Sequence, residues 1–323
     1  MMNAPEFWYT PSISPPFWAR ALSRIYGYAR KIHVALTHPK DAPIPTLCVG
    51  NITTGGAGKT PVVRALRALL NDYHTTVLLR GYGGKITTPT WVTPAHTAQD
   101  IGDEAMLHAR DGPVIIAKNR YDGAVAGGKK NTKLLILDDG LQNRSLRAHL
   151  NILVIDGATG FGNSQLLPAG PLRELLPDLI QRIQAVILIG DDTTNARAAL
   201  PPHLPVFTAH AEYDPLPHTM PYLAFSGLAQ PKKFYTALSE MGARVIATHD
   251  FADHHAYTDQ DIEHLRAEAQ KNNARLITTE KDHVKIPSRF HPDIDILKMR
   301  VVFDTPETLK TFIDHRIKEI SCP

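Results

Sequence analysis

The chain has 323 residues, of which 43% are hydrophobic and 21% are charged. This composition is ordinary for a globular protein and excludes a wholly disordered chain and a coiled coil, while the length predicts roughly two domains at about 150 residues each. The net charge of +3 is too small to indicate a nucleic-acid partner. Cys48 and Cys322 lie far apart in the sequence, which excludes a disulfide scaffold and a cysteine-based zinc ribbon and favours a reducing cytosol.

The first predicted element is an amphipathic helix over residues 17–36. Its apolar and aromatic side chains recur at helical spacing within an arc of roughly 140°; they are Trp18, Ala21, Leu22, Ile25, Tyr26, Ala29, Ile32 and Leu36. The cations Arg20, Arg24, Arg30 and Lys31 fall on the other side. Such a helix lies in a membrane interface with its cations on anionic lipid, or it docks on the protein's own core, and the helix alone leaves both interpretations open. No apolar run reaches the about 18 residues of a membrane-spanning helix, and the N-terminus lacks signal-peptide features.

Residues 46–70 have the pattern of a buried strand, a glycine-rich loop and a helix, with Gly58-Lys59-Thr60 at the end of the loop. This context predicts a P-loop, whose glycines let backbone N–H groups turn toward phosphate oxygens; the alternative is a chance glycine-rich turn. Lys59 would contact the β- and γ-phosphates, and Thr60 would bind Mg²⁺. The predicted nucleotide-binding residues are Thr53, Thr54, Gly55, Gly56, Ala57, Gly58, Lys59 and Thr60.

Further short apolar stretches predict strands that alternate with helices; they lie at 75–79, 113–117, 133–137, 151–155 and 185–189. This alternation favours an α/β, P-loop NTPase-like fold, with a mostly parallel sheet and helices on both faces. In such sheets ligands bind beyond the carboxyl ends of the strands. Asp138 and Asp139 follow one of these strands, and paired carboxylates suit Mg²⁺. The rival acid is Asp156 after the strand 151–155, and a further alternative is a helix-capping aspartate.

Other polar groups are expected at the same crevice. Arg80 and Tyr82 follow the strand 75–79. Asp103 and Glu104 begin a helical stretch, either as acid–base residues or only as complements of the helix dipole. A long Gly/Pro loop at 161–174 carries Arg173, which would clamp a phosphate or form a surface ion pair with its neighbour Glu174.

The prolines at 200–221 predict a linker, after which a second α/β pattern begins. Strands are expected at 222–225, 244–247 and 275–278, and helices at 231–241 and 259–272, the second capped by Thr258. His254 and His255 lie in the loop before that second helix, between Asp253 and Tyr257. The spacing of four zinc ligands is missing, so an orienting catalytic histidine is favoured over a metal site or a plain loop histidine.

Seven motifs, in this order, are similar to those of the tetraacyldisaccharide 4′-kinases, the lipid A 4′-kinases. They lie at 50–61, 80–84, 102–104, 138–142, 167–174, 253–255 and 279–282 and cover nearly the whole chain. The resemblance implies ATP- and Mg²⁺-dependent phosphorylation of the 4′-hydroxyl of a tetraacylated glucosamine disaccharide 1-phosphate in lipopolysaccharide biosynthesis. It also implies work at the cytoplasmic face of a bacterial inner membrane, where the helix 17–36 would meet the lipid substrate.

Within this resemblance Asp103 matches the catalytic base, and His254 matches its supporting histidine; Lys59 completes the expected catalytic set. The expected metal ligands are Thr60, Asp138 and Asp139. The expected substrate-binding residues are Arg80, Tyr82, Glu104, Gln142, Arg173 and Glu174. The expected divisions are a membrane-contacting segment at 1–40, a kinase core at 41–215 and a smaller C-terminal α/β lobe at 216–323, with no nucleic-acid or obligate protein partner.

Two other functions remain as alternatives. The first is a membrane-associated P-loop switch or partitioning ATPase. Residues 279–282 have the wrong spacing for guanine selection, and Thr54 stands where partitioning ATPases carry a lysine. The second is a soluble kinase for a small metabolite, which fits the core but leaves the basic helix 17–36 unexplained.

Overall fold

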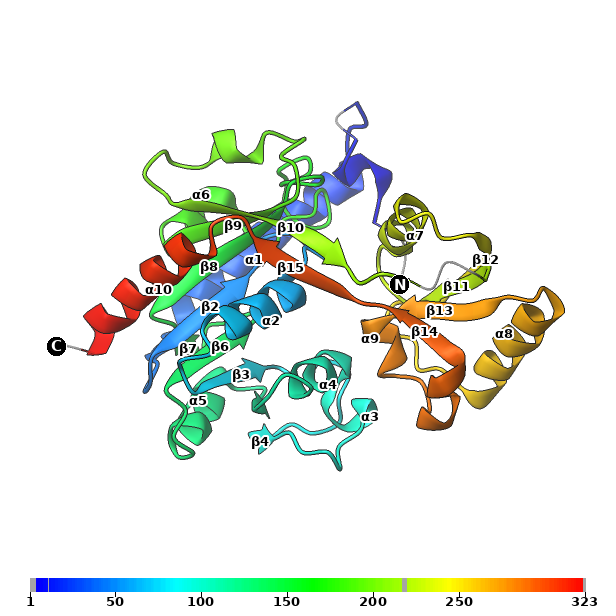
Figure 1. Cartoon of the computed structure of the whole chain (residues 1–323). Helices are drawn as coiled ribbons and strands as arrows, with labels where there is room; N and C mark the ends of the chain where they lie inside the picture. The colour runs from blue at the N-terminus through cyan, green and yellow to red at the C-terminus, as the bar shows by residue number, and fades with distance from the viewer. Residues whose placement is uncertain (1–3, 11, 217–219, 322–323) are drawn as a thin grey trace.

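The structure, a computed structural model, describes residues 4–10, 12–216 and 220–321, so Cys322 lies outside the described residues. The large sheet is built from β2 (Thr46–Gly50), β3 (Thr75–Leu79), β4 (Thr90–Trp91), β5 (Val114–Ile116), β6 (Leu134–Asp138), β8 (Leu150–Asp156), β9 (Ala185–Ile189), β10 (Val206–Tyr213) and β15 (Met299–Phe303). Their order across the sheet is β15-β10-β9-β8-β2-β6-β3-β5-β4 (Figure 1). Neighbours from β10 to β5 are parallel, whereas the edge strands β4 and β15 are antiparallel to theirs. The predicted mostly parallel sheet is confirmed.

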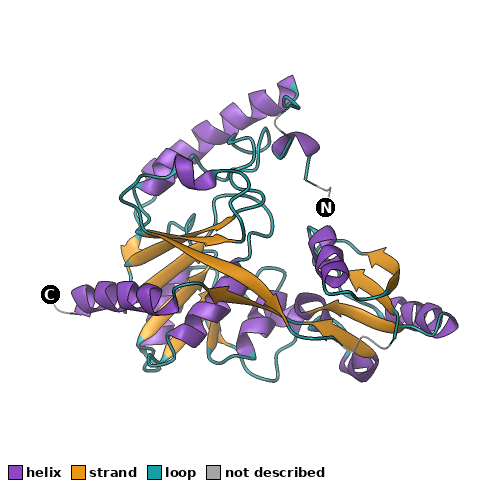
Figure 2. Cartoon of the chain, turned by 45° about the horizontal axis from the view of Figure 1, so that its top comes forward, coloured by secondary structure: helices purple, strands orange, loops and turns teal. Residues whose placement is uncertain are grey.

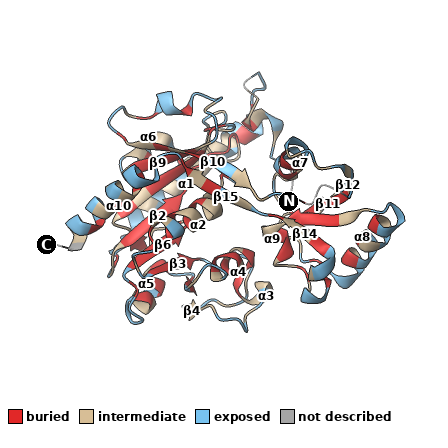
Figure 3. Ribbon diagram, in the orientation of Figure 1, coloured by how far each residue is buried: buried red, intermediate tan, exposed pale blue. Residues whose placement is uncertain are grey.

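Helices cover both faces of the large sheet. On one face pack α2 (Lys59–Leu69), α4 (Asp103–Ala109) and α10 (Pro306–Ser321), and on the other pack α5 (Arg120–Gly128) and α6 (Leu176–Ile180). Figure 3 shows the central strands as buried and the outer sides of the helices as exposed. The strands are near-continuous apolar runs because both faces of the sheet are covered. Shorter elements complete this part: η1 (Glu6–Trp8), β1 (Lys40–Asp41), α3 (Ala98–Ile101), β7 (Leu146–Arg147) and η2 (Ala196–Ala199).

A smaller lobe holds a second, all-parallel sheet. Its strands are β11 (Tyr222–Ser226), β12 (Val245–Asp250), β13 (Arg275–Thr279) and β14 (Ile294–Leu297), in the order β12-β11-β13-β14. Its helices are α7 (Pro231–Glu240), α8 (Asp259–Lys271), α9 (Glu280–His283) and η3 (Ser288–Asp293). Thr258 caps α8 as predicted: its side chain accepts from the Asp261 amide, and Asp261 accepts from the Thr258 amide. Such a reciprocal cap satisfies two N–H groups that the helix itself leaves unpaired.

The division between the lobes differs from the sequence-based expectation. Residues 200–221 were expected as a linker, but β10 lies within them and pairs in parallel with β9. The prolines stand beside this strand rather than inside it, since Pro205 precedes it and Pro215 follows it. After the small lobe the chain returns to the large sheet as β15 and α10. The expected C-terminal boundary of the lobe at 216–323 is therefore wrong, because β15 and α10 belong to the large sheet and its core.

The N-terminal helix α1 (Phe17–Leu36) has the predicted bounds and stands apart along the top of the molecule in Figure 2. Its apolar face points away from the protein: Phe17 is 80% exposed, Ile25 63% and Leu36 77%. Within α1, all of which is described, only Ala19 is buried. The interpretation that the apolar face docks on the core is therefore wrong. No helix among the described residues is long and apolar enough to cross a membrane.

Polar groups of Ser23, Tyr26 and Arg30, along one side of α1, hold the helix to the protein. The Ser23 hydroxyl donates to the Leu166 carbonyl over 2.9 Å, and the Tyr26 hydroxyl donates to the Arg173 carbonyl over 2.8 Å. Arg30 forms an ion pair with the wholly buried Glu174. Hydrogen bonds to the 161–174 loop thus fix the helix while its apolar side chains remain in solvent.

Candidate active site

The P-loop lies between β2 and α2, at the carboxyl edge of the large sheet. Gly58 has φ +77°, and a Cβ there would come within 2.8 Å of the Ile189 side chain, so this turn needs glycine. The Thr54 amide donates to the Pro171 carbonyl over 2.8 Å, which ties the loop to the segment that also holds α1. Lys59 Nζ donates to Asn51 Oδ1 over 2.8 Å at the start of α2. The predicted order of strand, glycine-rich loop and helix is present.

Asp138 ends β6, the strand next to β2 in the sheet, and this pairing brings its carboxylate to the P-loop. Its Oδ2 accepts from Thr60 Oγ1 over 3.0 Å and from His108 Nε2 over 2.8 Å. Its other oxygen, Oδ1, is buried and has no hydrogen-bond partner within the described residues. A buried carboxylate oxygen without a partner is costly unless a ligand completes it. Together with the Thr60 hydroxyl it forms a set of hard oxygen donors that suits Mg²⁺.

Asp139 has different partners from Asp138. Its backbone has φ +54°, and both of its carboxylate oxygens lie 2.9 Å from Arg173 Nη1. Lys59 Nζ lies 3.6 Å from Asp139 Oδ2. Burial would raise the pKa of Asp139, but the positive charges of Lys59 and Arg173 outweigh it and lower that pKa. Asp139 therefore neutralises two cations here, and its role as a metal ligand stays a prediction.

The rival acid Asp156 lies at the end of β8 and pairs with Lys233 of the small lobe. Its Oδ1 also accepts from the Ala158 amide over 3.0 Å. These contacts occupy Asp156 outside the P-loop, whereas Asp138 directly touches Thr60.

Asp103 and His254 come together from the two lobes. Asp103, the first residue of α4, is 5% exposed, and its Oδ2 lies 2.9 Å from His254 Nδ1. Burial would raise the pKa of Asp103, but the hydrogen bond from His254 and the charge of Lys281 lower it overall. The same hydrogen bond raises the pKa of His254. The sequence placed these residues 151 positions apart, and the fold makes them an acid–base pair.

Glu104 and Lys281 border this pair. Lys281 Nζ lies 3.9 Å from both Asp103 Oδ2 and Glu104 Oε1. Burial, followed by the negative charge of Asp138, raises the pKa of Glu104. The Tyr82 ring lies 5.5 Å from the His254 ring and is 58% exposed, while Arg80 is exposed at the end of β3. Tyr82 and Glu104 thus lie beside the Asp103–His254 pair, where we expect the substrate to bind.

Glu174 has a different place from the one expected of a substrate-binding residue. It is fully buried and forms ion pairs with Arg30 and Arg182, and its Oε1 accepts from Gln142 Nε2 over 3.0 Å. Gln142 Nε2 also donates to the Asn51 carbonyl over 2.9 Å. The expectation that Glu174 binds substrate is therefore wrong in this structure, because its carboxylate anchors α1 and the P-loop to each other. The alternative ion pair between Arg173 and Glu174 is wrong too, since Arg173 pairs with Asp139.

Three residues of the site escaped the sequence analysis. Asn51 lies in the P-loop motif, and its Oδ1 accepts a hydrogen bond from Lys59. His108 lies four positions after Glu104, a helical spacing that places both on one face of α4. Lys281 belongs to the motif at 279–282, to which the sequence assigns no catalytic role. The helical spacing of Glu104 and His108 was the one signal from which such a residue could have been found.

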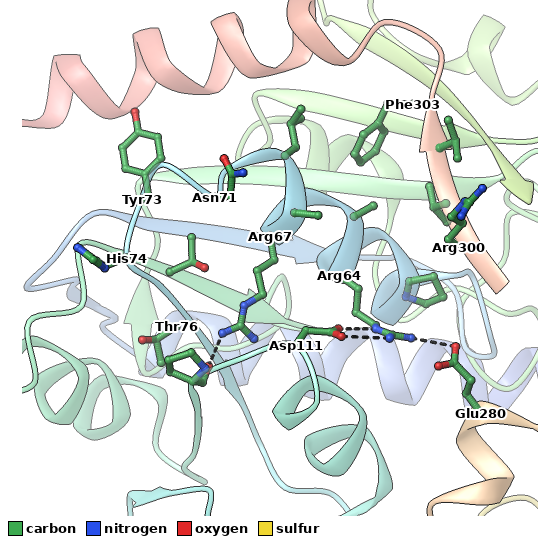
Figure 4. A pocket seen from close by; sticks show the side chains of 18 of the residues that line it. Arg64, Arg67, Asn71, Tyr73, His74, Thr76, Asp111, Glu280, Arg300 and Phe303 are labelled. Atoms are coloured by element: carbon green, nitrogen blue, oxygen red, sulfur yellow. Dashed lines mark hydrogen bonds and ion pairs between the residues drawn. The ribbon is translucent and has the colours of Figure 1, made fainter. Parts of the chain in front are cut away.

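A further connection between the lobes starts from α2, the helix that follows the P-loop. Arg64, on α2, donates from Nε to Asp111 over 2.6 Å and from Nη1 to Glu280 over 3.0 Å, as Figure 4 shows. These residues line a cavity of about 1100 Å³ on the flank of α2. None of residues 53–60 lines this cavity, so it is separate from the nucleotide site. Arg64 nevertheless links the P-loop helix to α9, the helix that carries Lys281.

Nowhere in 4–10, 12–216 or 220–321 do three or more His, Cys, Asp or Glu side chains gather as a metal site. The zinc alternative at 250–255 has no support from this geometry, since His255 instead lies 3.1 Å from Asp261. Mg²⁺ in nucleotide sites usually takes one or two protein ligands and completes its shell with phosphate and water oxygens. The pair of Thr60 and Asp138 is compatible with that pattern.

Comparisons with known proteins show which family this chain belongs to. A tetraacyldisaccharide 4′-kinase of Rhodospirillum rubrum is 40% identical over 329 residues, covering 98% of this chain and 98% of the relative. One from Gluconacetobacter diazotrophicus is 40% identical over 322 residues, covering 97% and 98%. The crystal structure of the "apo" form of LpxK from Aquifex aeolicus in complex with ATP is 28% identical with a TM-score of 0.77, covering 92% of this chain and 98% of that one. Since the family model of the tetraacyldisaccharide-1-P 4′-kinases matches residues 16–318, this chain belongs to that family.

Proposed function

We propose that this protein transfers the γ-phosphoryl group of ATP to the 4′-hydroxyl of a tetraacylated glucosamine disaccharide 1-phosphate, a step of lipid A biosynthesis. One observation carries the proposal. A P-loop with Lys59 lies at the carboxyl edge of the large sheet, and beside it the buried Asp103 lies 2.9 Å from the partly exposed His254. A P-loop positions a phosphoryl donor, and an acid–base pair beside it activates an alcohol.

The proposed reaction assigns a role to each of these residues. Asp103 accepts the proton of the 4′-hydroxyl as its oxygen forms a bond to the γ-phosphorus. The bond between the γ-phosphorus and the β–γ bridging oxygen breaks, and ADP leaves. Lys59 moves from Asn51 onto the phosphates and neutralises charge that develops there. His254 orients Asp103 and takes the proton onward.

We also infer that Mg²⁺ is required. Thr60 Oγ1 and the unpartnered Asp138 Oδ1 would hold the ion, which supplies positive charge to the phosphate oxygens. Arg173 is held on Asp139 and contributes a fixed guanidinium at the mouth of the same site. This arrangement keeps Lys59 and Arg173 close to the phosphates without two unpaired cations in a buried place.

We propose that the enzyme acts at the cytoplasmic face of a bacterial inner membrane. A lipid with four acyl chains stays in a bilayer, so the enzyme has to reach it there. The exposed apolar face of α1 supports such a contact, because it would bury its side chains at the acyl boundary. Arg20, Arg24 and Lys31 lie along one edge of this face and line a groove of about 440 Å³ with Ser164–Leu166, where they would meet anionic lipid.

The membrane contact is testable with substitutions that leave the fold intact. In the triple variant Leu22→Gln, Ile25→Gln, Ile32→Gln, binding to vesicles of anionic lipid is expected to weaken at least about 100-fold, because burial of each apolar side chain contributes about 1 kcal/mol or more. The side chains are 48%, 63% and 61% exposed, so the melting temperature should stay unchanged. Ile246→Gln in the small lobe, where Ile246 is 38% exposed, is the control. Full vesicle binding of the triple variant would place the contact elsewhere.

The pH dependence of the reaction follows from the Asp103–His254 pair. Below the raised pKa of His254 the imidazole is protonated and cannot take a proton from Asp103, whose own pKa is lowered. We expect kcat/KM to rise with pH through the pKa of His254, which lies above its ordinary value of about 6.5. The two groups titrate as a pair, so the midpoint belongs to both. In His254→Ala the acid limb of the pH–rate profile should move to lower pH; an unmoved limb would exclude this pair as its origin.

The expected effect of pH on the stability of the contact between the lobes is opposite to its effect on activity. Because the folded-state pKa of His254 is raised, its contribution to the contact between the lobes is fully present below about pH 6.5 and is lost as the pH rises through the folded-state pKa. Activity should therefore increase over the pH range in which this contact weakens.

The function itself is tested by incubating the protein with ATP labelled in its γ-phosphate and the disaccharide lipid in detergent micelles. Label should appear in the lipid, disappear when EDTA removes divalent cations, and return with added Mg²⁺. ATP hydrolysis with no label in the lipid would favour the regulatory P-loop ATPase. Label in a water-soluble sugar but not in the lipid would favour the small-metabolite kinase.

A further inference from the structure

We propose that His108 is a positioning residue for the metal, because it fixes the Asp138 carboxylate with one oxygen free to bind the ion. This inference rests on the proposed function, in which Asp138 holds Mg²⁺. His108 lies on α4, its side chain is 0% exposed, and among the described residues its Nε2 contacts the Asp138 carboxylate.

The hydrogen bonds of Asp138 are unequally divided between its two oxygens. Oδ2 accepts from His108 Nε2 over 2.8 Å and from Thr60 Oγ1 over 3.0 Å. Oδ1 has no partner within the described residues, although it is buried. An ionised carboxylate only accepts, so His108 donates its Nε2 proton and Thr60 its hydroxyl proton. Two donors on the same oxygen restrict rotation of the carboxylate and leave Oδ1 as the oxygen without a protein partner among the described residues.

His108 is needed once Thr60 turns to the metal. A hydroxyl that ligates Mg²⁺ through its oxygen keeps one proton, and its hydrogen bond to Asp138 then depends on the geometry of the bound nucleotide. His108 donates independently of the nucleotide, from a helix packed on the sheet core through Ala105 and Met106. A group that orients a metal ligand in this way typically changes metal affinity by about 10- to 100-fold.

The helix α4 joins this metal carboxylate to the proposed base. Asp103 stands in its first turn and His108 in its last, within seven residues. Helical residues move together because each backbone hydrogen bond spans one turn. A displacement of α4 that shifts Asp103 relative to the sugar hydroxyl therefore also shifts the donor on Asp138. The helix thereby keeps the positions of the proposed base and of the metal-binding carboxylate fixed relative to each other.

The experiment measures metal affinity rather than turnover. Mn²⁺, detected by electron paramagnetic resonance, is titrated into the full-length protein saturated with a non-hydrolysable ATP analogue. His108→Leu, which fills the site but donates no proton, should weaken Mn²⁺ binding about 10- to 100-fold. His108→Gln places an amide nitrogen near the position of Nε2 and should restore most of the affinity. Binding of the analogue without metal should be unchanged in both variants.

Controls separate this role from a structural one. His283 is another buried histidine, whose ring lies 3.9 Å from that of His291, and His283→Leu should leave Mn²⁺ affinity unchanged. His108→Asn keeps the amide of His108→Gln but is one methylene shorter, so it should bind Mn²⁺ as weakly as His108→Leu. The comparison of Asn with Gln therefore decides the question even if His108→Leu fails to fold.

The outcomes also separate this inference from the metal site itself. If Asp138→Asn weakens Mn²⁺ binding while His108→Leu and His108→Asn bind it like the wild type, the positioning role is overturned and the metal site stands. Equal losses in His108→Gln and His108→Asn would likewise overturn it, because the donated proton would then be irrelevant. Wild-type affinity in Asp138→Asn would instead overturn the assignment of Asp138 in the proposed function.

Discussion

Replacing Lys59 by alanine is expected to lower kcat for lipid phosphorylation by about 10²-fold or more, since charge stabilisation at a transferred phosphoryl group is worth roughly 3 kcal/mol. Its ammonium group stands at the start of α2, 2.8 Å from Asn51 Oδ1 and 3.6 Å from Asp139 Oδ2. From there it has a short path to phosphates bound on the loop. The measurement is transfer of the labelled γ-phosphate to the disaccharide lipid at saturating ATP.

The control for this prediction is Lys129→Ala, which removes an exposed lysine next to α5 and should leave kcat unchanged. Activity of Lys59→Ala within about tenfold of the wild type would mean that Lys59 does not contact the phosphates in the transition state. Losing Lys59 also removes one of the three cations, with Arg173 and Arg120, that lower the pKa of Asp139, so the variant should be compared at constant pH.

The second large effect is expected at the base. A sugar hydroxyl is a poor nucleophile, and a positioned proton acceptor contributes about 10²- to 10⁴-fold in rate. Asp103→Ala should lower kcat by such a factor while ATP binding stays near normal, because Asp103 lies on α4 and outside the P-loop. His254→Ala should have a smaller effect of the same kind. Because both atoms of the 2.9 Å hydrogen bond serve one proton transfer, the double variant should lose little more than Asp103→Ala alone.

His255 gives the matched control for His254. It is the next residue, but it lies 3.1 Å from Asp261 and stacks on Phe251 rather than facing the other lobe. His255→Ala should therefore matter little for kcat. Losses of Asp103→Ala and His254→Ala that multiply independently, or a greater sensitivity at His255, would show that Asp103 and His254 do not act as one unit.

The sequence allowed prediction of those parts of the site whose order along the chain determines their geometry. A strand, a glycine-rich loop and Gly58-Lys59-Thr60 form a P-loop locally, and the helix bounds at 17–36 follow from periodicity. The kinase family was also correctly predicted, because seven motifs in order are specific. The pairing of Asp103 with His254 was inferred from that resemblance alone. Nothing in the periodicity of either segment indicates that they meet.

Contacts that depend on the tertiary fold were beyond sequence reasoning. Glu174 is polar and lies in a loop, which is typical of an exposed binding residue, yet α1 covers it with Arg30. His108 lies on a short helix, and only the packing of that helix on the large sheet brings its side chain to Asp138. The return of β15 to the large sheet was not predicted, because the order of strands in a sheet depends on contacts between residues far apart in the sequence. The prolines around β10 were interpreted as a linker between domains because proline is common in linkers.

The antiparallel pairing of β10 with β15 has a consequence for how the molecule is assembled. Tyr213 lies opposite Met299, so the chain leaves the large sheet and re-enters it at facing residues. In topological terms the whole small lobe occupies the place of a hairpin turn. A short Asn-Gly connection between these two residues should yield a protein that closes the same hairpin, still binds ATP and lacks His254. The two segments that connect the lobes lie side by side and together form one hinge between the lobes. If the small lobe moves about this connection, we expect its contacts with Arg64, Asp103 and Asp156 to break and re-form.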